Sequence, residues 1–300
     1  MVRSLAFRLA VLYRTALRFA PLRRENKPSA TDFVIISMTD RKHALMCEQM
    51  LASIGRIWSE FPTIRLLVDE RRGPVNFDRL QRSYSGRIEA VAWAEITTQY
   101  LQKSRPELVN FAEGNLLGRK LAFIAASAEQ QRTLWVDNDI LFFRDFVPLV
   151  RTQTAGTFVG ATRDSSFGHK GLFCGYAPKL AQHLFKDQSD IPSINTGLCL
   201  CNGPVYEAFE LASLVKHTLK IREQNYFTEQ TVLAWAALQS RGVIWDTQIV
   251  RLDDTDIYRL RPLPGQEFWW ARHYTGNIRH LFWRDAFFLH SKTASRKAQP

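Results

Sequence analysis

Two aspartates separated by one residue interrupt an apolar stretch near the middle of the chain. Residues 133–143 read Thr-Leu-Trp-Val-Asp-Asn-Asp-Ile-Leu-Phe-Phe, the composition of a strand buried on both faces of a sheet. A buried carboxylate needs a cation or several hydrogen-bond donors. Because residues i and i+2 of a strand share one face, Asp137 and Asp139 can reach one ion. The stretch predicts a divalent-metal site; a solvated turn or a helix cap is the alternative for a bare Asp-x-Asp.

The segments on either side alternate between strand and helix patterns. Short apolar runs predict strands, and apolar residues at helical spacing predict helices. The predicted strands are 33–37, 64–68, 88–93, 133–143, 157–161, 194–201 and 242–245, and the predicted helices are 41–58, 78–84, 116–128 and 228–239. This order favours an α/β fold with a mostly parallel central sheet, whose ligands bind at the carboxyl ends of the strands.

The net charge of +11 comes mostly from the two ends of the chain. Residues 1–30 carry a net +6 and residues 291–300 a net +3, which leaves +2 for the middle. Because no recognised nucleic-acid motif accompanies this charge, we expect no nucleic-acid partner. The four cysteines are too few for a disulfide framework, so we expect reduced core thiols. Cys199 and Cys201 could bind a metal with a distant histidine, but their apolar neighbours favour packing.

A basic amphipathic helix is predicted for residues 2–24. At helical spacing its basic and apolar residues fall on different sides: Arg3, Arg14 and Arg18 on one, and Leu5, Leu9, Leu12 and Phe19 on another. Its arginines and its broken apolar run favour lying on a membrane surface over crossing the bilayer. A helix that packs on the domain and an organellar transit peptide are the alternatives.

Several short motifs follow one another in an order typical of one enzyme family. They are Lys120-Leu121, Asp137-Asn138-Asp139, Asp164 after a Gly-Ala turn, Asn195-Thr196-Gly197, Glu229-Gln230 at the start of a helix, and His273-Tyr-Thr-Gly276-Asn-Ile-Arg279. In this set the chain resembles the GT-A fold glycosyltransferases, and among them the retaining family 8 type, whose members use a UDP-sugar and Mn²⁺. It departs from that pattern at Arg279 and Glu229, where the family has lysine and aspartate, and at His280, where the family has proline.

The resemblance implies a donor site that is built around a metal ion. Asp137, Asp139 and His273 would bind Mn²⁺ or Mg²⁺, and a nitrogen ligand suits Mn²⁺ better than Mg²⁺. Arg279 would contact the diphosphate of the UDP-sugar with bidentate geometry. The other residues assigned to the donor are Ser37, Thr39, Lys120, Asp137 and Gly276.

The resemblance also implies how the sugar would be transferred. Asp164 and Asn195 would hold sugar hydroxyls, and Gln230 would lie beside Glu229 against the far face of the sugar, near the anomeric carbon. An amide is a poor nucleophile, so front-face attack is favoured over a covalent intermediate on Glu229. The expected activity is transfer of a hexose to a saccharide or glycolipid acceptor with retention. An inverting GT-A transferase and a catalytically silent, membrane-docked nucleotide-sugar-binding module are the alternatives.

These inferences predict three regions along the chain. Residues 1–30 form the basic helix and a linker, residues 31–290 a GT-A-like catalytic domain, and residues 291–300 a disordered basic tail. Through residues 1–24 the protein is expected to lie peripherally on the cytoplasmic face of a membrane, near a lipid-borne acceptor such as a polysaccharide precursor.

Overall fold

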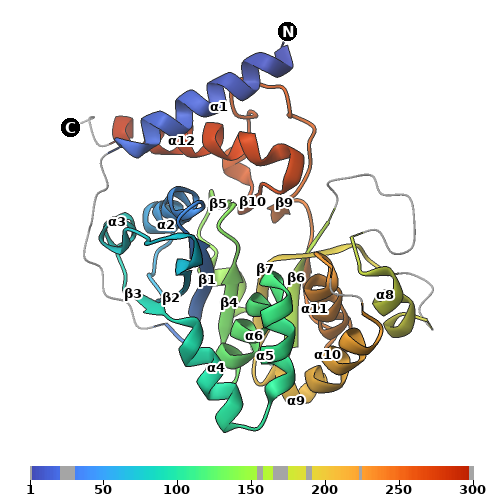
Figure 1. Cartoon of the computed structure of the whole chain (residues 1–300). Helices are drawn as coiled ribbons and strands as arrows, with labels where there is room; N and C mark the ends of the chain where they lie inside the picture. Colours follow the sequence, from blue (N-terminus) through green and yellow to red (C-terminus); the bar gives the residue numbers. More distant parts are fainter. Residues whose placement is uncertain are drawn as a thin grey trace.

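A seven-stranded sheet forms the centre of the computed structural model, which describes residues 2–20, 31–153, 158–164, 175–186, 191–222 and 225–296. Its strands lie in the order β3 (Ile88–Val91), β2 (Ile64–Asp69), β1 (Val34–Asp40), β4 (Thr133–Val136), β7 (Ile194–Asn202), β6 (Phe158–Arg163) and β8 (Ile244–Trp245) (Figure 1). β7 is antiparallel to both of its neighbours, and the other pairs are parallel. The predicted α/β fold with a mostly parallel sheet is therefore confirmed.

Directly after the two aspartates, the chain enters a second sheet of three strands. It consists of β5 (Ile140–Phe142), β10 (Ala271–His273) and β9 (Val250–Arg251). The prediction of one continuous strand over residues 133–143 was wrong, because β4 pairs with β1 and β7 whereas β5 pairs with β10. The chain turns between them, where the amide of Ile140 donates to the carbonyl of Asp137 at 3.2 Å. Asp137 and Asp139 thus lie on a turn between two sheets.

Helices cover both faces of the central sheet because its strands are apolar on both sides. In β1, Ile35 belongs to one core and Val34 and Ile36 belong to the other. The first core is covered by α2 (Ala44–Ile57), α3 (Phe77–Ser83) and α7 (Val147–Arg151). The second is covered by α4 (Trp93–Gln102), α5 (Pro106–Gly114), α6 (Leu116–Ala128), α8 (Pro178–Leu184), α9 (Val205–Ala208), α10 (Leu211–Lys220) and α11 (Thr228–Gln239). Short 3-10 helices are η1 (Glu70–Arg72), η2 (Gln266–Phe268) and η3 (Gly276–Ile278).

Two helices from the ends of the chain lie side by side next to the second sheet (Figure 1). They are α1 (Val2–Arg18) and α12 (Arg279–Arg296), and they share a third core. Because α12 reaches Arg296, residues 291–296 are helical where a disordered tail was predicted, and residues 297–300 lie outside the described residues. None of the described helices combines the length and the apolar character needed to cross a bilayer.

The cysteines agree with the prediction of reduced core thiols. Cys47, Cys199 and Cys201 are buried and free, and the sulfurs of the last two lie 4.0 Å apart. Cys174 lies outside the described residues.

Candidate active site

A cavity of about 470 Å³ opens where the parallel strands end. Thr39 lies near the end of β1, Asp137 follows β4, and Asp164 follows β6. Because β7 runs in the opposite direction, its first residues, Asn195 to Gly197, reach the same edge of the sheet. All of these residues line the cavity. The predicted site residues therefore converge at the carboxyl edge, where α/β folds bind their ligands.

Two carboxylates and an imidazole form a compact cluster in this cavity. Asp137, Asp139 and His273 each offer a ligand atom, and these atoms lie within 4.8 Å of one another. His273 Nε2 is 3.0 Å from an oxygen of Asp139 and 3.8 Å from an oxygen of Asp137. The histidine reaches the turn because β10 pairs with β5, opposite Ile140. His273 and Asp139 thus meet at one site although they are 134 residues apart in the sequence, as the motifs predicted.

Gly197 on β7 makes room for the imidazole. A Cβ atom at this position would lie 2.1 Å from His273 Cε1 and 2.7 Å from its Nε2. The ring is buried against the β7 backbone, and Nε2 faces the carboxylates, whereas Nδ1 has no hydrogen-bond partner among the described residues. Two carboxylates and one imidazole nitrogen suit Mn²⁺ and also accommodate Mg²⁺. The residues present therefore fit a divalent cation.

Arg279 places a second positive charge beside the cluster. Its guanidinium donates two hydrogen bonds to Asp139, of 2.8 and 3.2 Å, from the first residue of α12. Burial by itself would raise the pKa of Asp139, but His273 and Arg279 lower it to about 2. The Arg279 side chain is 45% exposed, so it can contact a ligand in the cavity as well as Asp139.

A buried ion-pair cluster fixes the strand that carries His273. The neighbouring residue, Arg272, is fully buried and binds both Asp256 and Asp285. Arg284 of α12 binds the same two carboxylates. Because removal of one partner would leave an uncompensated buried charge, the cluster holds β10 firmly against α12. It thereby fixes the distance between His273 and the start of α12.

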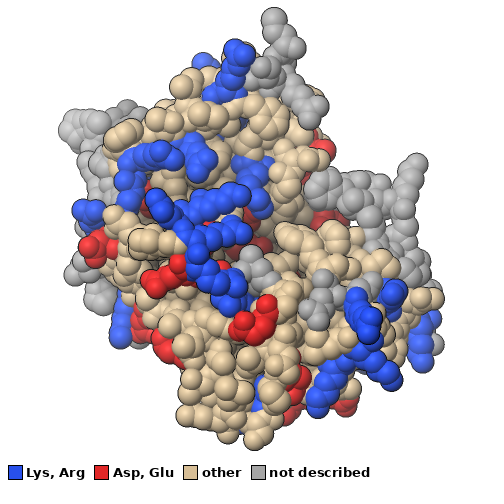
Figure 2. All heavy atoms as spheres, in the orientation of Figure 1, with Lys and Arg blue, Asp and Glu red and all other residues tan. Residues whose placement is uncertain are grey.

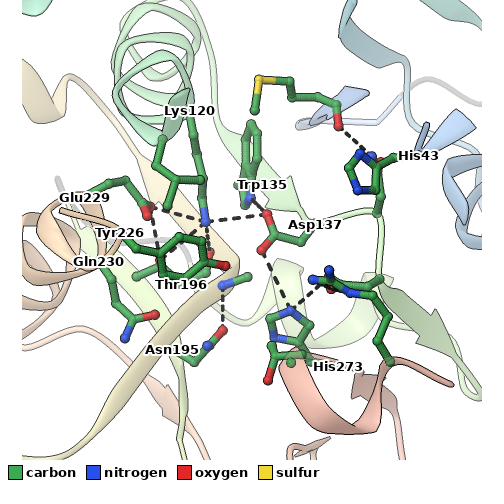
Figure 3. A pocket seen from close by; sticks show the side chains of 18 of the residues that line it. His43, Lys120, Trp135, Asp137, Asn195, Thr196, Tyr226, Glu229, Gln230 and His273 are labelled. Carbon is green, nitrogen blue, oxygen red and sulfur yellow. Dashed lines mark hydrogen bonds and ion pairs between the residues drawn. The ribbon is translucent and has the colours of Figure 1, made fainter. Parts of the chain in front are cut away.

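Lys120 forms the opposite wall of the site, as Figure 3 shows. Its ammonium donates to the carbonyl of Thr196 at 3.0 Å and lies 3.2 Å from Glu229 and 3.5 Å from Asp137. Burial by itself would lower the pKa of Lys120, but the charges of Asp137 and Glu229 raise it above its usual value. Burial raises the pKa of Glu229, which also accepts a hydrogen bond from Thr196. Lys120 is therefore a fixed cation.

The residues assigned to the sugar line the cavity with their side chains held in place. The Asn195 side chain accepts a hydrogen bond from the amide of Gly197 at 2.8 Å, and the Gln230 amide donates to the carbonyl of Gly175 at 2.6 Å. Asp164, Glu229 and Gly276 line the same cavity. The structure brings together all of the predicted site residues except Ser37, which is absent from the cavity lining.

Ser37 supports the turn and does not line the cavity. It is fully buried, its hydroxyl donates to the carbonyl of Val136 at 2.6 Å, and its oxygen lies 3.2 Å from Oδ1 of Asn138. Asn138 in turn donates to the carbonyl of Met38 at 2.7 Å. These hydrogen bonds between β1 and the residues after β4 fix the position of the aspartates.

Several cavity residues were not assigned from the sequence. Trp135 donates to an Asp137 oxygen at 2.6 Å, and the Lys120 ammonium lies 5.2 Å from the centre of its ring. Tyr226 and Phe227 precede α11, line the cavity and are 68% and 40% exposed. The sequence signal that could have found them is their position next to the family motifs, since Trp135 lies two residues before Asp137 and Phe227 lies two residues before Glu229.

The fold has known counterparts, although the sequence alone finds none. No protein-family model matches the chain, and no curated protein matches it in sequence. Mouse xyloside xylosyltransferase 1 superimposes with a TM-score of 0.55 and 12% identity, over 83% of this chain and 99% of that protein. The galactosyltransferase LgtC, solved with donor and acceptor sugar analogues, superimposes with a TM-score of 0.54 and 14% identity, over 86% of this chain and 95% of that protein. GlyE of Streptococcus pneumoniae TIGR4 superimposes with a TM-score of 0.53 and 15% identity, over 89% of this chain and 64% of that protein.

These similarities confirm the expected fold class. The chain has a GT-A-type glycosyltransferase fold, and its cluster of carboxylates and histidine lies at the carboxyl edge of the central sheet.

Proposed function

We propose that the protein is a metal-dependent glycosyltransferase that moves a hexose from a UDP-sugar to a saccharide or glycolipid acceptor with retention of configuration. The observation that carries this proposal is the meeting of Asp137, Asp139 and His273 beside Arg279 and Lys120 in one cavity of a GT-A fold. Sugar transfer from a nucleotide diphosphate requires positive charge around the departing diphosphate, and this cavity supplies it.

The donor diphosphate would lie between Arg279 and the group formed by Asp137, Asp139 and His273. A divalent ion held by Asp137, Asp139 and His273 would neutralise the charge that develops on the departing diphosphate. Arg279 offers a planar guanidinium of the kind that matches phosphate oxygens, and it keeps N–H groups that Asp139 does not accept from, on a side chain that is 45% exposed. Lys120 is already held by Thr196 and Glu229, so it needs little reorganisation to stabilise charge.

The surroundings of Glu229 and Gln230 favour front-face transfer. The Glu229 carboxylate is occupied by Lys120 and Thr196, and the Gln230 amide is a poor nucleophile. In the step we propose, the acceptor oxygen bonds to the anomeric carbon as the carbon–oxygen bond to the diphosphate breaks on the same face. The acceptor proton passes to an oxygen of the leaving diphosphate. No covalent sugar intermediate forms on Glu229 or Asp164.

Two exposed aromatic rings favour a saccharide acceptor. Tyr226 and Phe227 line the cavity, and the centres of their rings lie 5.5 Å apart with an angle of 89° between the ring planes. Sugar rings present C–H faces that pack on aromatic side chains, and the tyrosine hydroxyl can hydrogen-bond a sugar oxygen. Phe227→Ala should therefore raise the KM for the acceptor by a larger factor than it changes the rate of slow donor hydrolysis.

The direct test measures UDP release from a panel of UDP-hexoses in Mn²⁺ without an acceptor. We expect slow hydrolysis of one donor, its loss on chelation of the metal, and its loss in Asp139→Ala. With an acceptor, the anomeric configuration of the product, read by NMR, should match that of the donor. Binding of UDP without any turnover would instead identify a silent binding module, and product of inverted configuration would refute retention.

A further inference from the structure

One side of α1 is occupied by contacts within the protein. Ala6, Ala10 and Leu17 are buried against the rest of the molecule, and Tyr13 stacks on Phe287 of α12 at 4.8 Å between ring centres. This packing is the alternative to membrane binding that the sequence left open. Packing explains only the residues on this side of the helix.

The opposite side of α1 exposes a second apolar line. Leu5 and Leu12 are separated by seven residues, which places them on one side of the helix, and Phe19 follows the last helical residue at the same spacing; they are 45%, 62% and 83% exposed. Val11, next to this line, is 63% exposed. Large side chains left in water along a helix that already has a buried face indicate a second binding surface.

The described part of α1 itself carries only positive charge. Residues 2–20 contain no acidic residue, and Arg8 and Arg18 are exposed. On the packed side of the helix, Arg259 and Arg261 are exposed on either side of Leu260, whose carbonyl accepts a hydrogen bond from Tyr13 of α1, and the exposed Asp254 lies in the same segment. Figure 2 shows many basic side chains over the upper and central parts of one face of the molecule. The chemical partner of this surface is therefore apolar and negatively charged.

We propose that the outward side of α1, defined by Leu5, Arg8, Leu12 and Phe19, binds the surface of an anionic lipid bilayer. Arg8 lies between Leu5 and Leu12, within the apolar line. At a protein interface this arginine would have to be desolvated and paired. At a bilayer surface its aliphatic stem lies among acyl chains while its guanidinium reaches lipid phosphates. The helix lies in the plane of the interface.

The lipid-binding side is tied to the catalytic cavity through α12. Phe7 of α1 stacks on His280 at 4.3 Å, and His280 directly follows Arg279, which binds Asp139. A bilayer bound by α1 therefore has a fixed position relative to the cavity. If the proposed glycosyltransfer is correct, on which this consequence alone rests, a lipid-borne acceptor at an anionic cytoplasmic leaflet would meet the cavity in one orientation.

The test uses the full chain and substitutions on the outward side of α1. Deletion of the helix would uncover Leu281 and Phe287 of α12, so it would confuse binding with folding. Leu12→Glu with Phe19→Glu changes only exposed side chains. Leu101→Glu is the matched control, because Leu101 is 55% exposed on α4, at the other end of the molecule in Figure 1.

The assay is co-sedimentation with vesicles of equal parts phosphatidylcholine and phosphatidylglycerol. The wild type and Leu101→Glu should bind equally, and binding should weaken with salt and on vesicles of phosphatidylcholine alone. The double variant should bind at least about tenfold more weakly, and Arg8→Gln about fivefold more weakly. All variants should keep the wild-type melting temperature and the same slow donor hydrolysis, which separates docking from activity.

Two results would overturn the proposal. One is equal vesicle binding by the wild type and the double variant. The other is a wild-type dimer in sedimentation velocity that dissociates in the double variant while neither binds vesicles, which would assign the surface to a second copy of the chain.

Discussion

Gly197→Ala should disturb the cluster of Asp137, Asp139 and His273 without replacing any of these three side chains. The substitution adds one methyl group on β7, where the imidazole of His273 lies against the backbone. The added carbon would lie 2.1 Å from His273 Cε1, whereas ordinary carbon contacts are about 3.5 Å. The ring must therefore move by more than about 1 Å, because it is the side chain and not the paired strand that can give way.

That movement takes Nε2 away from the carboxylates. Nε2 now lies 3.0 Å from Asp139, and the buried Arg272 on the same strand prevents β10 from following the ring outward. A misplacement of about 1 Å in a catalytic group can cost about a hundredfold in rate, equivalent to about 2.7 kcal/mol. We expect a loss of this size in UDP release, together with a weaker apparent affinity for Mn²⁺.

The assay measures UDP release over a series of Mn²⁺ concentrations, with circular dichroism as a check of folding. Gly55→Ala in α2 is the control, since its added carbon meets no atom closer than 3.4 Å and alanine favours the helix. In Gly197→Ala with His273→Ala the clash is absent, so the double variant should be no worse than His273→Ala alone. Wild-type Mn²⁺ affinity in Gly197→Ala, or fully additive losses in the double variant, would refute this reasoning.

Three further predictions concern the cavity and the cluster behind it. Asp139→Ala should abolish turnover while leaving the circular dichroism spectrum unchanged, because it removes one of the proposed metal ligands; near wild-type turnover in Mn²⁺ would contradict the proposed site. Gln230→Ala should slow transfer and leave the product anomer unchanged, and mass spectrometry should find no sugar on Glu229. Although burial opposes it, Arg272 and Arg284 lower the pKa of Asp256 to about 2. This lies below the unfolded value of about 3.9, so the stabilisation is present above about pH 4 and about 2 kcal/mol of it is lost as pH falls toward 2, as urea unfolding at several pH values would show.

The sequence was sufficient for the fold class and for predicting residues that line one cavity, all of the predicted site residues except Ser37. Alternating strand and helix patterns specify an α/β sheet because each pattern is local and repeats along the chain. The site was predictable because polar residues such as Asp137, Asn195 and Glu229 stand next to buried strands or helices, where only function or pairing explains them. Since ligands bind at the carboxyl edge of such sheets, these positions were expected to converge.

The tertiary structure decided what depends on pairing between distant segments. Residues 133–143 look like one strand, but β1 and β7 pair with the first part and β10 with the second, so the aspartates lie on a turn. Ser37 appeared to be a ligand residue, but its hydroxyl faces Val136 and Asn138.

For α1, the helical period gave an apolar and a basic side, but it could not show that Ala6, Ala10 and Leu17 would be the residues buried against the rest of the molecule. Small residues carry little hydrophobic signal, yet they allow two helices to approach closely. Which side of a helix is buried depends on the shape of its partner, and α12 lies more than 250 residues further along the chain. The larger side chains of Leu5, Leu12 and Phe19 were thereby left on the outside.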